Sequence, residues 1–301
     1  MKLKETKIES IADILKKAIE SGLTVPKSVK TKDWPIFNEV TGGFRPHEFS
    51  IICGSTGIGK TTFLANLAWQ LILTSTKQFI MSVETGPNDF SMRLLSVAGK
   101  KDLNAIDVIP KDIVSDVVIK HQKELFKSST YFSLYEDRVS VEQLKQDVST
   151  IVNKYGVQIV FIDNLNYLME VKRSADQIIE MDRVIHELIV FVKTCPVHIV
   201  MIMHSRKPEG STGADYGRVE NEFQIKGSST AVQEAQNVFL LNRPKEKEIQ
   251  DGKRKYSDRE FKIAKMRRRG KYVGCEIVFE CTESRYFEKA INDIYGSFKS
   301  N

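Results

Sequence analysis

The chain has few cysteines and no long apolar run, and both shortages narrow what it can be. Its 301 residues include four cysteines, none in a C-x-x-C pair, so neither a disulfide framework nor a structural zinc site is expected. No apolar stretch approaches the roughly 20 residues that cross a membrane, and the opening MKLKETKIES contains no hydrophobic signal core. We therefore expect no membrane association and a reducing compartment, the cytoplasm.

Proline and glycine are also scarce, with eight and 17 residues, and no low-complexity tract is present. An apolar share of 41% in a chain of this length predicts one substantial core with at most a small appendage. The net charge of +6 is unevenly spread, because residues 243–271 hold thirteen Lys or Arg against five Asp or Glu. Such a block is typical of a solvated face or of a surface for an acidic partner.

Short β-rich runs alternate with helical stretches from about Trp34 onward, which predicts an α/β fold with a mostly parallel central sheet flanked by helices. Before it, residues 7–20 form an amphipathic pattern and 25–32 a linker, so we divide the chain into 1–32 and 33–301. Strands are expected at 49–53, 79–83, 131–135, 157–162, 198–203, 238–242, 260–265, 276–280 and 285–288. Helices are expected at 60–73, within 89–128, at 140–155 and at 175–193, and a long polar loop at 205–226.

Three of the apolar runs end on an ionisable residue: Glu84, Asp163 and His204. The carboxyl ends of parallel strands meet at one edge of a sheet, where ligands of open α/β folds bind. We therefore expect these three side chains to lie together.

The first strong strand leads into GSTGIGKT, which satisfies the pattern G-x-x-x-x-G-K-[ST] of a phosphate-binding loop. Its backbone N–H groups would wrap phosphates at the positive end of the following helix. Lys60 would reach the β and γ phosphates, and the Thr61 hydroxyl would ligate Mg²⁺. The residues expected to contact the nucleotide are Gly54, Ser55, Thr56, Gly57, Ile58, Gly59, Lys60, Thr61 and Thr62. A plain glycine-rich turn is the alternative.

The three strand-end residues fit the remaining tasks of a hydrolase. Asp163 closes the run IVFID and would hold a metal-bound water; alone, it could be an ordinary strand-end acid. Glu84 is the candidate general base that orients the attacking water, with a helix cap as the alternative because Thr85-Gly86-Pro87 follows. His204 would sense the γ-phosphate, or else be a structural histidine.

Taken together, the motifs resemble the RecA-like motors of hexameric replicative DNA helicases of the DnaB/Twinkle type. The resemblance runs from about Asp33 to Lys289 and rests on the order and spacing of the motifs. It is nearest to the phage primase-helicases. Besides the loop and Glu84, the motifs are VTGGFRP at 40–46, FIDNL at 161–165, HSRKP at 204–208, KGSS at 226–229 with Gln233, and KMR at 265–267.

The resemblance implies further site residues. Lys265 and Arg267 would be fingers that reach the nucleotide bound by the neighbouring subunit, and Gln233 would act with His204 as a phosphate sensor. Arg243 and Phe279 would pack on the nucleotide base. The DNA phosphates would be gripped by Arg206, Lys207, Lys226, Gly227 and Ser228. The helix at 7–20 would be a linker helix that docks on an adjacent subunit.

The family's activity follows as an expectation: a 5'-3' helicase motor, fuelled by ATP or another NTP with Mg²⁺, that translocates on single-stranded DNA as a homo-oligomeric ring. The resemblance implies a hexamer in bacterial or phage-infected cytoplasm. Primase or other replisome proteins would be partners, since no part of the chain resembles a primase or collar. Two features depart from the family. The triple Arg267-Arg268-Arg269 leaves the finger open by one residue, and the loop at 209–222 is acidic.

Two alternatives to the helicase motor remain. One is a recombinase or clock-type regulatory ATPase of the same fold. The other is a nucleotide-dependent loader or assembly module that binds a partner and does not unwind DNA.

Overall fold

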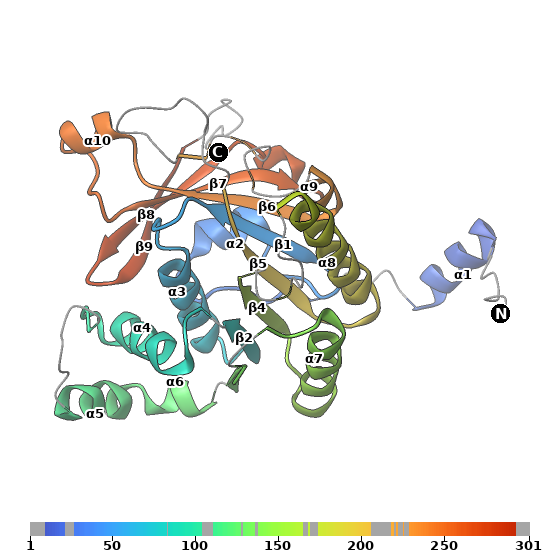
Figure 1. The fold of residues 1–301 in the computed structure, drawn as a ribbon, viewed down its shortest axis with the longest axis horizontal. Coiled ribbons are helices and arrows are strands. Elements are labelled where there is room, and N and C mark those ends of the chain that lie inside the picture. Colours follow the sequence, from blue (N-terminus) through green and yellow to red (C-terminus); the bar gives the residue numbers. More distant parts are fainter. Residues whose placement is uncertain are drawn as a thin grey trace.

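A computed structural model of the chain describes residues 10–21, 27–82, 84–103, 111–127, 129–135, 138–164, 168, 174–205, 218–219, 221, 225 and 229–292. Within these ranges the chain forms a nine-stranded sheet with the strand order β3-β2-β4-β5-β1-β6-β7-β8-β9. Figure 1 shows the sheet between helices, with the red hairpin of β8 and β9 at one end. The α/β class predicted from the alternation of patterns is confirmed.

The first six strands run parallel, and the last three are antiparallel to their neighbours. The parallel strands are β1 (Phe49–Gly54), β2 (Gln78–Ser82), β3 (Thr130–Phe132), β4 (Ile159–Asp163), β5 (His198–His204) and β6 (Asn237–Asn242). The antiparallel ones are β7 (Arg259–Met266), β8 (Glu276–Thr282) and β9 (Arg285–Asn292). Each predicted strand is present to within a few residues, because apolar runs buried on both faces mark the centre of such a sheet.

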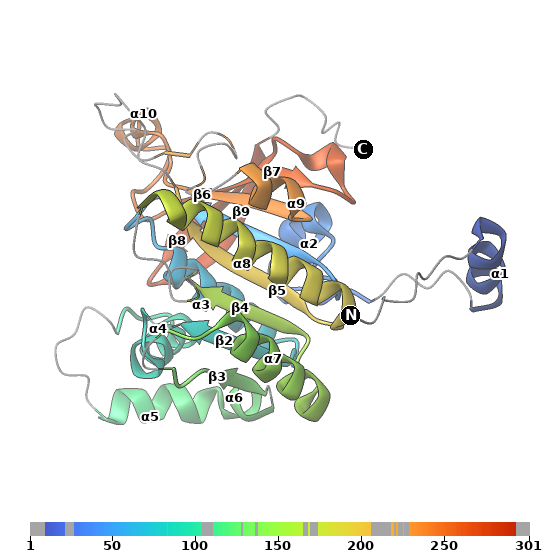
Figure 2. The same cartoon turned by 45° about the vertical axis from the view of Figure 1, so that its right-hand side comes forward.

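Helices cover both faces of the sheet, and each face has its own apolar core. One layer contains α2 (Pro35–Thr41), α3 (Lys60–Ile72), α4 (Pro87–Gly99), α5 (Lys111–Lys120) and α6 (Gln122–Lys127); the other contains α7 (Val141–Tyr155), α8 (Ser174–Thr194) and α9 (Ser229–Glu234). Strand β1 serves both cores, since Ile52 packs with the α3 layer while Ile51 and Cys53 pack with the α7–α8 layer. Figure 2 shows α8 lying across the sheet on this second face.

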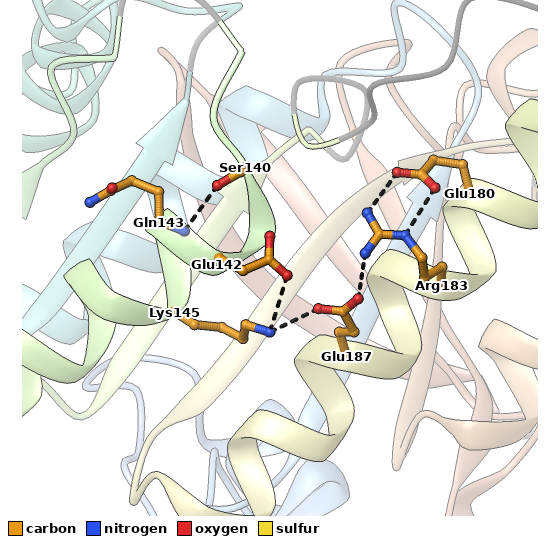
Figure 3. A network of polar contacts seen from close by, with 7 residues as sticks. All are labelled: Ser140, Glu142, Gln143, Lys145, Glu180, Arg183 and Glu187. Carbon is orange, nitrogen blue, oxygen red and sulfur yellow. Dashed lines mark hydrogen bonds and ion pairs between the residues drawn. The ribbon is translucent and has the colours of Figure 1, made fainter. Parts of the chain in front are cut away.

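Helix α7 begins as predicted, because the Ser140 hydroxyl accepts a hydrogen bond from the Gln143 backbone N–H at 3.1 Å. A surface network joins α7 to α8 (Figure 3). Lys145 Nζ lies 2.8 Å from Glu187 Oε2, and Arg183 on α8 binds both Glu187 and Glu180. The second helical layer is therefore joined by apolar packing beneath and by ion pairs outside.

Four features were not predicted as separate elements. Helix α2 follows Trp34, and the region 89–128 contains the three helices α4, α5 and α6. The short α9 precedes β6, and α10 (Glu246–Gln250) lies between β6 and β7. Their brevity leaves too few turns for a helical period to be recognised.

The chain already packs against the body before Trp34. Val29 and Phe44 form a backbone bridge, with hydrogen bonds of 2.7 and 2.8 Å. Gly43 has a φ of 76°, and a Cβ at this position would lie 2.3 Å from the Val29 carbonyl oxygen. The glycine pair of the VTGGFRP segment therefore permits this close backbone contact, which a linker pattern at 25–32 did not predict.

Helix α1 (Ile11–Ser21) exposes its apolar stripe. Ile11, Leu15 and Ile19 are 71%, 55% and 78% exposed, and both views draw the helix apart from the sheet (Figures 1 and 2). The start of the predicted helix, residues 7–9, lies outside the described residues. None of the helices in the described ranges combines the length and apolar character needed to span a lipid bilayer.

Candidate nucleotide-binding and hydrolysis site

The phosphate-binding loop connects β1 to α3, as its pattern predicts. Strand β1 ends at Gly54 and α3 begins at Lys60. Gly57 and Gly59 have φ values of 75° and 88°, a region that glycine enters at little cost. The following helix directs its unpaired N–H groups at the loop, which makes the site attractive to phosphate.

Lys60 lies across this loop and contacts the end of β5. Its Nζ lies 3.0 Å from the Gly54 carbonyl, 2.8 Å from the Ser55 carbonyl and 3.1 Å from His204 Nδ1. Burial lowers the pKa of the Lys60 ammonium below 10.5, and the negative charges of Cys53, Asp163 and Glu84 oppose that shift. The lysine is thus a partly desolvated cation in the position where phosphate oxygens would compete for it.

Thr61 and Asp163 meet beside the loop, with Thr61 Oγ1 donating to Asp163 Oδ2 at 2.8 Å. Burial raises the pKa of the Asp163 carboxyl and the nearby Glu84 raises it further, whereas Thr61 and Lys60 lower it. Hydroxyl and carboxylate oxygens are hard donors that suit Mg²⁺, which keeps several waters and takes few protein ligands. The described residues hold no cluster of three or more His, Cys, Asp or Glu, so this donor pair fits Mg²⁺ bound together with phosphates.

Glu84 lies next to the same edge, just beyond β2. Its Oε2 accepts a hydrogen bond from Asn164 Nδ2 at 2.6 Å, so the residue after Asp163 orients it. Helix α4 has Gly86 as its N-cap, without a side-chain cap. Glu84 therefore does not cap that helix, and the carboxylate is exposed beside Asp163 and Lys60.

His204 ends β5, which lies between β4 and β1 in the sheet. Besides Lys60 Nζ, its Nδ1 lies 3.4 Å from Thr56 Oγ1. The three strand-end residues predicted to converge, Glu84, Asp163 and His204, thus surround the phosphate loop. The parallel register of β2, β4, β5 and β1 is the cause.

Arg243 reaches the loop from beyond β6, since its Nη2 donates to the Gly57 carbonyl at 2.9 Å. Its guanidinium lies 4.2 Å from the ring centroid of Tyr256, which is 60% exposed. Phe279 does not join them. It is fully buried against Trp34 and Phe63, so the prediction that it packs on the nucleotide base is wrong.

The exposed aromatic residue beside Arg243 is Tyr256, which the sequence pattern did not single out. Arg259 also contacts the loop, through the Ile58 carbonyl. Both residues belong to the basic block 243–271. Within this block nothing in the spacing distinguishes a residue at the loop from one facing solvent.

The expected finger residues lie at the opposite edge of the sheet. Lys265 Nζ donates to the Val232 and Gln233 carbonyls at 2.7 and 2.6 Å, and Arg267 Nη2 donates to the Gln233 carbonyl at 2.8 Å. Strand β7 carries both regions, and Lys265 comes six residues after Arg259. At about 3.4 Å per residue, Lys265 is about 20 Å from its own phosphate loop.

This placement corrects one expectation. The Gln233 backbone is bound by Lys265 and Arg267, so the structure does not bring Gln233 to His204 within one chain. The other two arginines of the triple have structural partners. Arg268 Nε lies 2.6 Å from Glu48 Oε1, and Arg269 donates to the Glu39 carbonyl at 2.6 Å. Arg267 is exposed, and within the described part of the chain it binds only the neutral carbonyls of Gln233 and Glu234.

The residues expected to grip DNA, Arg206, Lys207, Lys226, Gly227 and Ser228, lie outside the described residues. Their neighbours Ser205 and Ile225 form a backbone bridge. Within the long loop, Val219 is buried, and its backbone N–H and C=O each pair with the Asn242 amide at 2.9 Å.

The strand order and the loop–acid arrangement define a P-loop NTPase domain of the RecA-like class. Comparison with known proteins agrees: residues 31–288 match the family model of the DnaB-like helicase C-terminal domain. Because this match covers most of the chain, the protein belongs to the DnaB-like helicase C-terminal domain family. It is a helicase motor domain by family, as the motifs suggested.

Individual relatives are distant. The chain is 25% identical over 211 residues to a DNA helicase/primase of Enterobacteria phage T3, a match that covers 68% of this chain and 37% of that protein. It therefore spans little more than a third of that relative's length.

Two solved structures share the fold. A DnaB-like replicative helicase, solved with its interactions with primase, superposes with a TM-score of 0.70 at 17% identity, over 94% of this chain and 67% of that one. The second structure is an isolated ATPase domain, which gives a TM-score of 0.71 at 16% identity, over 94% of this chain and 100% of that one.

Proposed function

We propose that this chain is an NTP-driven motor of the replicative helicase type, which translocates on single-stranded DNA in the 5'-3' direction as a ring, hexameric in this family. The observation that carries the proposal is the division of the catalytic residues between two edges of the sheet. Lys60, Thr61, Asp163 and Glu84 lie at one edge, whereas Lys265 and Arg267 lie at the other. One chain thus holds two halves of different active sites.

At the first edge, each residue has a task in hydrolysis. Lys60 and the loop N–H groups bind the β and γ phosphates, and Thr61 with Asp163 would hold Mg²⁺. The metal ion would neutralise charge on the phosphate oxygens. Glu84, held by Asn164, orients a water in line with the γ-phosphorus and takes its proton. The bond between the γ-phosphorus and its bridging oxygen breaks, and the diphosphate leaves.

At the second edge, Arg267 and Lys265 would stabilise the transition-state charge on a nucleotide bound by the next subunit. Head-to-tail contacts of this kind close into a ring. The exposed apolar stripe of α1, Ile11, Leu15 and Ile19, supports docking on a neighbouring subunit, since it covers nothing in its own chain among the described residues. A lone subunit would then be a poor ATPase.

Coupling to DNA would run through the segment after His204. His204 contacts Lys60, and Arg206 and Lys207 follow two and three residues later. Loss of the γ-phosphate would change the contacts available to His204 and shift the basic ends of the loop. Contacts to phosphates carry little sequence information, so DNA binding is expected to be independent of sequence and to weaken with salt. Primase or other replisome proteins are proposed partners.

The test is the ATPase rate per subunit against protein concentration, with and without single-stranded DNA. We expect the rate per subunit to rise with concentration as rings form, and to rise again with DNA. The variant Lys207→Ala with Lys226→Ala is expected to lose the DNA stimulation, while a control with two surface lysines changed, Lys253→Ala with Lys255→Ala, retains it. A rate that depends on neither concentration nor DNA would contradict the motor and favour a loader.

A further inference from the structure

The carbonyl groups of the phosphate loop need donors of their own. A loop that turns its N–H groups toward phosphates directs several C=O groups away from them, and buried carbonyls without partners are costly. Here two arginines supply the donors. Arg243 binds the Gly57 carbonyl at an exposed position, and Arg259 Nε donates to the Ile58 carbonyl at 2.7 Å in a buried one.

Arg259 is held firmly behind the loop. It is 8% exposed, and its Nη1 lies 3.1, 2.9 and 2.6 Å from the carbonyls of Tyr256, Ser257 and Asp258. Its guanidinium also packs on Gly59, where an added Cβ would lie 3.2 Å from Nη2. One planar group therefore joins two consecutive loop residues to a single turn.

That turn is itself anchored to the sheet. The Asp258 carboxylate accepts hydrogen bonds from the backbone N–H groups of Lys255 and Cys281, at 2.9 and 3.1 Å. Arg259 is the first residue of β7 and pairs with Phe279 of β8. The contact to Ile58 thus connects the loop to the antiparallel end of the sheet.

We propose that Arg259 is a positioning residue of the phosphate loop, which sets the Ile58–Gly59 main chain in the conformation that binds nucleotide phosphates. The inference rests on the proposed NTPase function and deepens it by naming what supports the loop from behind. Lysine cannot replace Arg259, because an ammonium is a point donor that cannot span the Ile58 carbonyl and the turn together.

The experiment uses the full chain and fluorescent ADP with Mg²⁺. For Arg259→Lys we expect about tenfold weaker ADP binding or more, the effect of losing a buried hydrogen bond from a charged donor. The matched control is Arg285→Lys, another buried arginine, 9% exposed, whose hydrogen-bond partner is Asp33. It is expected to bind ADP within about twofold of the unaltered chain.

A second readout separates positioning from stability. Each variant is heated with and without ADP, and the ADP-induced rise in its own unfolding midpoint is compared. A purely structural Arg259 would lower the midpoint but leave that rise unchanged, and this result would overturn the inference, as would ADP affinity within about twofold of the unaltered chain. If Arg259→Lys does not fold, Arg259→Gln is used with the same criteria. Should the unaltered chain itself fail to bind ADP, the proposed function is wrong, and not the positioning role alone.

Discussion

Thr61 Oγ1 donates a hydrogen bond to Asp163 Oδ2 over 2.8 Å. The two residues come from elements that are not neighbours in the sheet, because β5 separates β4 from β1. Their contact therefore depends on the first turn of α3 projecting over the carboxyl edge. It brings together the two oxygen donors that the proposed Mg²⁺ site requires.

The variant Asp163→Asn tests that pair. The amide keeps the size of the side chain but removes the charge that would hold Mg²⁺, so kcat should fall by about 100-fold or more. Binding of ADP measured without Mg²⁺ should stay close to that of the unaltered chain. Hydrolysis that keeps its normal Mg²⁺ dependence in this variant would place the metal ion elsewhere.

Mixing two inactive variants tests whether the active site is shared between subunits. Lys60→Ala removes the phosphate-binding lysine and Arg267→Ala the finger, so each alone should hydrolyse little NTP. In mixed rings about a quarter of the interfaces would join an intact Lys60 to an intact Arg267, and ATPase activity should reappear. Arg268→Ala, which loses the pairing with Glu48, is the control and should remain active. Mixed rings without recovered activity would argue against a shared site.

His198 should make stability depend on pH. It is fully buried, with Nδ1 2.7 Å from the Arg45 carbonyl and Nε2 2.8 Å from Ser50 Oγ, and burial lowers the pKa of His198 from 6.5 to about 4. The unfolded chain binds this proton first, so the contribution is complete above the unfolded pKa and is lost as pH falls toward the folded one, by about 3 kcal/mol. Urea unfolding of the unaltered chain and His198→Gln should differ in slope between these pH values; parallel curves would contradict the assignment.

Arg218 should be far more important for stability than Arg183. Its Nη1 lies 2.7 Å from Glu260 Oε2 and its Nη2 3.3 Å from Glu276 Oε1, with the Arg218 side chain 7% exposed. Arg218→Met leaves two buried carboxylates without this cation and should cost about 3–5 kcal/mol of unfolding free energy. The Arg183 side chain is 44% exposed in the network of Figure 3, and Arg183→Met should cost about 1 kcal/mol or less. Chemical denaturation gives both values, and equal losses would refute the contrast.

The sequence alone was enough to predict the half of the site at the carboxyl edge. The glycines and Lys60 of the loop, and the acids that end β2 and β4, are signals contained in a few consecutive residues. The rule that parallel strands end at one edge then brings Glu84, Asp163 and His204 together without further information. The motifs also indicated the family, since their order along the chain is a property of the sequence.

Only the tertiary structure decided which residues reach the site from elsewhere. Phe279 and Tyr256 are both aromatic residues in late segments, but one is buried in the core and the other is exposed beside Arg243. Gln233 follows the KGSS motif, yet its backbone binds the finger residues. Arg259 looks like any cation of a basic block until β7 starts it behind Ile58. Local patterns determine backbone conformation over a few residues. Burial and contact between distant residues depend instead on strand order and register, which here turn one chain into two half-sites.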